Sequence, residues 1–201
     1  LIYSIFSLLF SGAGSFLSAE PNIAPEEEII IDEKKESSEK PSWKSLWDKA
    51  RLQIRDNRLE DAKVTYETLV ALKPNIVAAS WEYCKLLVTL GEWEDAAHVV
   101  EGLLDYEPEN LQFLLTAGRI ALENKRFNKA TQYFGQVFES DPVGPFSNEA
   151  ILGLVKGLTG IESKKGALVL LEQYYQRGNT EDSVVVELAR LSKELGLYRQ
   201  A

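Results

Sequence analysis

The sequence contains few of the residues from which metal and catalytic sites are built. Among 201 residues there is one cysteine, one histidine and no methionine. Cys84 therefore cannot form a disulfide within the chain, and the redox compartment stays undetermined. No cysteine or second histidine stands at metal-ligand spacing from His98, so we expect no metal site. Because methionine is absent, we expect the native start to lie outside this sequence.

Basic residues are also scarce. The net charge is −9, and residues 20–40 alone hold eight acids against three lysines. A general nucleic-acid binder needs a basic face that displaces counterions from phosphate, so the composition excludes that class. One histidine leaves no Ser–His–Asp set, and "SGAGS" precedes no expected strand, so no phosphate loop is predicted. We therefore predict a non-enzymatic protein without cofactors.

Residues 1–19 carry no charge at all. An apolar stretch followed by small residues is the layout of a secretory signal, with Ser11/Ala13 or Ala13/Ser15 before the cut. The alternatives are an uncleaved membrane anchor, which 19 residues just allow, and a buried N-terminal helix of a cytosolic protein. We expect export to the periplasm or cell envelope, with a cleaved signal favoured over membrane attachment through residues 1–19.

Residues 20–41 are rich in Glu, Lys, Ser and Pro, which predicts a disordered acidic linker. Within it, Ile29–Ile31 form an apolar triplet, which is either a short docking strand or incidental. The remaining residues, 42–201, are predicted to form the folded domain.

A 34-residue period runs through that domain. Four columns of residues keep one register over three copies: Ala62, Ala96 and Ala130; Tyr66, Val100 and Phe134; Leu69, Leu103 and Val137; Pro74, Pro108 and Pro142. A period of this length indicates stacked supersecondary units. Each unit reads as two amphipathic helices around a polar break, and the proline prevents the second helix from continuing.

We predict repeats at about 43–76, 77–110 and 111–144, a degenerate one at 147–179 and an incomplete one at 180–201. In the fourth we expect Ser147 to cap a helix over 147–160, and inserted residues within 157–166. In the fifth we expect Thr180 to cap a helix that Gly196 ends, with Ala189 as its small residue and Ala201 in the alanine column. The apolar stripe of this helix would be uncovered on one side (Val184, Val185, Leu188, Leu191, Leu195). We thus expect a fragment of a longer protein, or a second chain that covers the end.

Small residues recur at the predicted helix crossings. Ala50, Cys84 and Gly118 lie midway along the first helices, opposite the alanine column of the second helices. Cys84 is therefore expected to be a packing residue, and His98, two residues after Ala96, a surface group.

These columns resemble the tetratricopeptide repeat over residues 42–143. The pattern departs from the family in the first helices, where Trp47 and Trp81 stand one place late and Lys49 and Gln53 replace apolar residues. The resemblance implies an all-α fold, an α-solenoid of tandem helix-turn-helix repeats in a right-handed superhelix. It also implies a concave groove, lined by the first helices, that holds a peptide or partner protein.

The candidate peptide-groove residues repeat at offsets that share one side of a helix. They are Trp47, Arg51, Trp81, Lys85, Leu115 and Arg119, and Arg190 continues the basic column. A basic ladder with apolar neighbours suits an extended segment with acidic and apolar side chains. The alternative is surface decoration, with each cation paired inside its own helix (Arg51 with Asp48, Lys85 with Glu82, Arg119 with Glu123, Arg190 with Glu187). A clamp for a C-terminal carboxylate is disfavoured, because its positions supply a single cation.

Two functions therefore remain open. The first is a non-catalytic protein-protein interaction scaffold of the cell envelope. The second is the repeat or adaptor region of a larger enzyme, secretion or polysaccharide-export protein whose working domain lies beyond Ala201.

Overall fold

The computed structural model describes residues 41–197, and all of their regular secondary structure is α-helical. The predicted export segment at 1–19, the linker up to residue 40 and the predicted place of Ala201 lie outside the described residues. The helices are α1 (Trp43–Arg55), α2 (Leu59–Leu72), α3 (Val77–Leu90), α4 (Trp93–Tyr106), α5 (Leu111–Glu123), α6 (Phe127–Ser140), α7 (Ser147–Gly160), α8 (Lys164–Gln176) and α9 (Asp182–Glu194). None of these helices is long and apolar enough to span a bilayer.

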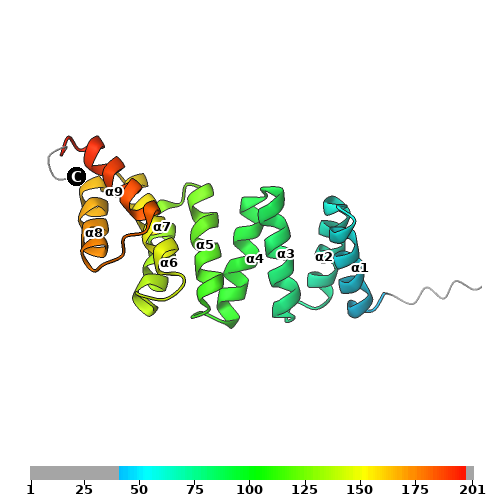
Figure 1. The fold of residues 1–201 in the computed structure, drawn as a ribbon. Helices are drawn as coiled ribbons and strands as arrows, with labels where there is room; N and C mark the ends of the chain where they lie inside the picture. Colours follow the sequence, from blue (N-terminus) through cyan, green and yellow to red (C-terminus); the bar gives the residue numbers. More distant parts are fainter. Residues whose placement is uncertain (1–40, 198–201) are drawn as a thin grey trace, which may run out of the picture. The chain divides into compact units, whose positions relative to one another are not determined.

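The helices follow one another in chain order, each packed mainly on its neighbours in sequence (Figure 1). Helices α1 to α8 form four antiparallel pairs, and α9 packs on α8. This tandem arrangement is an α-solenoid, as the 34-residue period predicts.

The turn after each odd-numbered helix has the same backbone geometry in all five copies. One residue takes a left-handed conformation, and the next residue donates its N–H to a carbonyl five positions earlier, as in the Schellman motif. The left-handed residues are Asn57, Gly91, Lys125, Glu162 and Gly196. The turn is thus a structural repeat with the same 34-residue spacing as the packing columns, interrupted once.

The predicted packing columns form the core. Ala50, Cys84, Ala62, Ala96 and Ala130 have no exposed surface, which confirms the expected close crossings. The large residues of the second helices fill the space between pairs and are at most 2% exposed (Tyr66, Val100, Phe134, Leu69, Leu103, Val137). One departure from the family is also accommodated, because the buried amide of Gln53 accepts a hydrogen bond from Thr65 Oγ1 at 2.8 Å.

The predicted position of the insertion in the fourth repeat is wrong. The turn between α7 and α8 covers 161–163, the same length as the turns at 56–58 and 124–126. The connection from α6 to α7 instead has six residues, 141–146, where 73–76 and 107–110 have four. This segment reads Asp-Pro-Val-Gly-Pro-Phe, so its two prolines extend the connection rather than the helices.

Ser147 is likewise not the N-cap of α7. It is the first helical residue and is buried, with Oγ donating to the carbonyl of Gly144 at 2.8 Å and lying 3.1 Å from Tyr174 Oη. The hydroxyl is therefore committed to fixing the preceding turn and to a contact with α8.

Three expectations for α9 also need correction. The helix begins at Asp182, so Glu181 rather than Thr180 occupies the N-cap position. The stripe is largely covered, since Val184 and Leu191 are buried and Leu188 and Leu195 pack on the same cluster. Ala189, which was expected to be the small packing residue of this helix, is exposed instead, as are Val185 and Val186.

Candidate functional site

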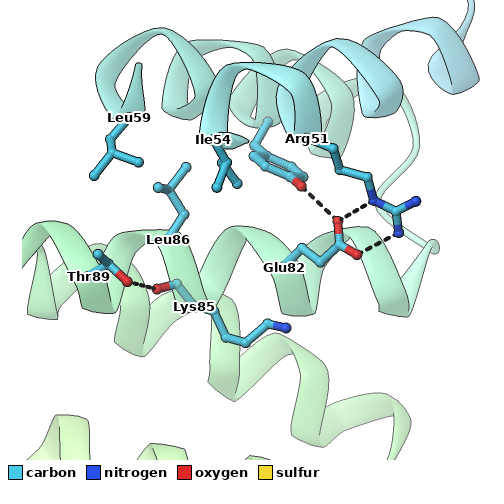
Figure 2. Close-up of a pocket in the computed structure, with 8 residues that line it drawn as sticks. Arg51, Ile54, Leu59, Glu82, Lys85, Leu86 and Thr89 are labelled. Atoms are coloured by element: carbon cyan, nitrogen blue, oxygen red, sulfur yellow. Dashed lines mark hydrogen bonds and ion pairs between the residues drawn. The ribbon is translucent and has the colours of Figure 1, made fainter. Parts of the chain in front are cut away.

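A cavity of about 350 Å³ opens between the first two helix pairs, bounded by α1, α2 and α3 (Figure 2). We call it the inter-repeat pocket. Its apolar wall comes from Ile54, Leu59 and Leu86. Its polar lining is Arg51, Tyr66, Glu82, Lys85 and Thr89.

Glu82 organises the polar side of the inter-repeat pocket. Its carboxylate accepts hydrogen bonds from Arg51 Nη2 at 2.6 Å and Nε at 3.0 Å, from Trp47 Nε1 at 2.6 Å and from Tyr66 Oη at 2.7 Å. Trp47 and Arg51 lie on α1, Tyr66 on α2 and Glu82 on α3. One carboxylate therefore ties three helices of two repeats together (Figure 2).

The environment keeps Glu82 ionised. Partial burial alone would raise the pKa of this carboxyl, but the hydrogen bonds from Arg51, Trp47 and Tyr66 outweigh it and lower the pKa from the ordinary 4.5 to about 2. Burial, and then the bond to Glu82, raise the pKa of the Tyr66 phenol. The hydrogen bond to Glu82 also raises the pKa of Arg51. All three groups therefore hold fixed protonation states at neutral pH.

Lys85 lies one turn beyond Glu82 on α3 and, unlike Arg51, is not paired with a carboxylate in the described part of the chain. Its side chain is exposed, and within residues 41–197 its ammonium forms no ion pair. Its nearest aromatic contact is the ring of Trp81, with Nζ at 5.7 Å from the centroid. Thr89 Oγ1 donates to the Lys85 carbonyl at 2.9 Å, which leaves the hydroxyl oxygen able to accept.

The structure brings only some of the six predicted groove residues together. Arg51 and Lys85 line the inter-repeat pocket, and Trp47 supports it through Glu82. Trp81 packs against Phe113, with ring centroids 4.9 Å apart. Leu115 is 4% exposed, so it belongs to the core, because it packs in the cluster around α6.

Arg119 lies elsewhere, in a second cavity of about 590 Å³ between the third and fourth helix pairs. There it forms an ion pair with Glu149 of α7. This cavity is also lined by Lys156 and Glu181, so its charged lining balances.

The predicted ion pairs within single helices are mostly wrong. Arg51 and Arg119 pair with an acid on the first helix of the next repeat, Glu82 and Glu149 respectively. Only Arg190 pairs within its own helix as predicted, with Glu187, and it also contacts Glu194. The expected basic ladder is thus mainly a set of contacts that hold helices together.

Sequence reasoning missed Glu82 and Tyr66 as the centre of this site. The signal was present, because Glu82 stands 31 residues after Arg51, three short of the repeat period. An acid at that offset lies one turn before the equivalent of Arg51 on the next first helix. Leu59, Leu86 and Thr89 carried no signal of their own.

Cys84 and His98 are the two residues whose side chains could have indicated a reactive or metal-binding site. Cys84 is fully buried, its thiol contacts the Ala96 carbonyl at 3.7 Å, and burial raises its pKa to about 12. His98 is exposed on α4, as predicted. No group of three or more His, Cys, Asp or Glu side chains in the described part of the chain could hold a metal ion.

Comparisons with known proteins match part of the array to a repeat family. Residues 85–145 match a family model described as tetratricopeptide repeat. A search of curated protein sequences finds no match. Solved structures with the same fold include a MamA RS-1 double mutant, at TM-score 0.66 and 16% identity, which covers 77% of this chain and 85% of that one.

Two further structures share the fold. A tetratricopeptide repeat protein from Parabacteroides merdae has TM-score 0.63 and 18% identity over 81% of this chain and 62% of that one. The pilF protein of Pseudomonas aeruginosa has TM-score 0.59 and 18% identity over 78% and 70%. At these identities the likeness extends to the fold alone.

Proposed function

We propose that the array is a non-catalytic scaffold that binds a partner protein through the inter-repeat pocket, because residues 85–145 match the tetratricopeptide repeat and repeats of this family generally mediate protein–protein interaction. The binding face is the surface around α1 and α3 where Ile54, Lys85 and Thr89 line the pocket.

The observation that carries this proposal is the combination of a preformed apolar cavity with polar groups that the fold does not use. Ile54 is 37% exposed beside the inter-repeat pocket, although its neighbours Tyr66 and Leu86 are buried. Cavities that bind ligands are usually concave, apolar and largely preformed, with a few polar groups that fix orientation. The hydrogen bonds to Glu82 hold Arg51 and Tyr66 in place on the polar side of this cavity.

The even-numbered helices present a different surface. Charged side chains on these helices and in the turns that precede them connect one repeat to the next, through Lys63 with Glu92, Arg126 with Glu94, and Lys129 with Glu101. Because these charges are already paired inside the array, this side offers less to a charged partner.

Site-specific photo-crosslinking in the producing cell tests the proposal. A photoreactive residue placed at Ile54 or Thr89 should give a discrete crosslinked partner. The same residue at Val64 or Val169, which are 61% and 51% exposed on α2 and α8, should not. Crosslinks confined to Val64 or Val169 would place the interaction on the even-numbered helices and overturn the proposal.

We further propose that the array works outside the cytoplasm, in the periplasm or cell envelope. The support is the uncharged apolar and small-residue pattern of residues 1–19. The segment can be fused, behind the native start, to a reporter enzyme that is active only outside the cytoplasm. Reporter activity equal to that of an unfused, cytosolic control would contradict export.

A further inference from the structure

We propose that the inter-repeat pocket selects an aliphatic side chain next to an Asp or Glu side chain in an extended segment of the partner, and that Lys85 is the cation that binds the carboxylate. This inference rests on the proposed function. It replaces the expected ladder of equivalent cations with a single one.

The charge of Arg51 is already balanced within the fold, although this residue lies in the same pocket. Its guanidinium is engaged by both oxygens of Glu82, at 2.6 Å and 3.0 Å, and lies 4.4 Å from the Trp47 ring. A bidentate Arg–carboxylate pair is among the stronger hydrogen-bonded arrangements in proteins. A partner carboxylate that reached the remaining N–H groups of Arg51 would also meet the negative charge of Glu82, so this ion pair offers it little net attraction.

The other cations of the predicted ladder are similarly occupied. Arg119 pairs with Glu149, and Arg190 pairs with Glu187 and Glu194. Within residues 41–197, Lys85 is thus the member of this column whose charge takes part in no ion pair. Lys85 is an exposed residue, so its ammonium, which has three N–H donors, is accessible to an acceptor on a partner.

The charge of the lining determines the sign of the ligand. The inter-repeat pocket has Arg51 and Lys85 against Glu82, an excess of one positive charge. The second cavity has Arg119 and Lys156 against Glu149 and Glu181, with no excess. An anionic side chain of the partner is therefore attracted electrostatically to the inter-repeat pocket. A lysine or arginine of the partner would instead meet the Glu82 carboxylate, which already accepts four hydrogen bonds.

The remaining groups indicate an extended main chain with an aliphatic side chain. The side chains of Ile54, Leu59 and Leu86 form an apolar wall, so burial of a Leu, Ile or Val side chain against it is favourable. Thr89 has an oxygen that can accept a backbone N–H from the segment. Lys85 and Thr89 lie four residues apart on α3, so they flank the same stretch of bound chain.

Short synthetic peptides, acetylated and amidated at their ends, test the inference. The first carries a central Ile–Leu flanked by Asp and Glu, the second has Asn and Gln in their place, and a third has Lys. Binding to the protein is followed by chemical shifts of the Trp indole N–H groups in NMR titrations. We expect the acidic peptide to bind at least tenfold more tightly than the neutral one, with an affinity that falls as salt is raised.

Variants then identify the cation. Lys85→Gln should weaken the acidic peptide about tenfold, to the level of the neutral one. Lys85→Arg should restore most of the affinity, and the matched control Arg119→Gln should stay within twofold of the parent. Equal binding of acidic and neutral peptides, or a Lys85→Gln variant that binds like the parent, would overturn the inference.

A fourth peptide, neutral inside but with a free C-terminal carboxylate, separates the two sources of a carboxylate. If this peptide binds tightly and the acidic peptide does not, the inference that Lys85 binds an Asp or Glu side chain is overturned. The outcome for the proposed function is independent, because crosslinks at Ile54 and Thr89 report on any partner at this face. If crosslinks form at these positions but the Lys85→Gln variant binds the acidic peptide like the parent, only the preference for an acidic segment is rejected.

Discussion

The ring of Phe134 lies directly against Gly118, so a Cβ atom on this glycine would lie 2.8 Å from two ring atoms. On its other side the same ring closes on Gly153, where a Cβ would lie 2.5 Å away. Phe134 of α6 therefore lies between the glycines of α5 and α7. The large residue in one column requires the small residues in the adjacent helices.

Replacing Gly118 by alanine should destabilise the array by about 1–3 kcal/mol, because the added methyl overpacks the Phe134 contact. The matched control is Gly102→Ala in α4, where a Cβ meets nothing within 4 Å. That change should stabilise by about 0.5–1 kcal/mol through helix propensity alone. Urea unfolding of the two variants measures the difference, and equal midpoints would show that the Phe134 contact is not tight.

Glu82 should contribute a pH-dependent part of the stability. Its folded pKa lies below the ordinary value of 4.5, at about 2. The contribution is thus fully present above about pH 4.5 and is lost as the pH falls toward 2. The difference in free energy of unfolding between wild type and Glu82→Gln should therefore shrink steadily across this window. A difference that stays constant from pH 6 to 2.5 would contradict the assignment.

The hydroxyl of Tyr174 should matter although the ring is buried. Tyr174 Oη lies 3.1 Å from Ser147 Oγ and donates to Asn148 Oδ1, so it links α8 to the start of α7. Tyr174→Phe should cost about 0.5–1.5 kcal/mol, because it removes the hydrogen bond to Asn148 and the polar contact with Ser147. Tyr175→Phe, which alters a 39% exposed neighbour, serves as the control. Equal thermal midpoints for the two variants would count against the link.

Cys84 should be unreactive in the folded protein. Its thiol is fully buried and burial raises its pKa to about 12, so almost no thiolate exists at pH 8. Labelling by a thiol reagent should be negligible in buffer and complete in denaturant. Rapid labelling of the native protein, with its helical circular dichroism unchanged, would show that the second helix pair opens locally.

The packing columns could be predicted from the sequence because they depend on side-chain volume at fixed spacing. Ala96 and Phe134 are where the 34-residue period puts them, and their burial follows directly from that register. Electrostatic partners are different, since they depend on which helix lies next to which. Arg51 was assigned to Asp48 on its own helix, but the neighbouring α3 brings Glu82 closer.

The candidate site was accordingly predicted in part. Lys85 and Arg51 were named, and both line the inter-repeat pocket. Leu115 was named because its column holds Trp47 and Trp81, but a leucine in that place lies within the core. Whether a residue in a column reaches the surface depends on the sizes of neighbours that lie a whole repeat away.

The packing of each helix mainly on its neighbours in the chain also governs how the protein folds. Contacts that close within one or two repeats demand only short loops, so the entropy lost before the first stabilising contact is small. Folding can then begin at any pair and spread in either direction, and it should be fast for a chain of this length. During synthesis, α1 and α2 can pair while the rest of the array is still being translated.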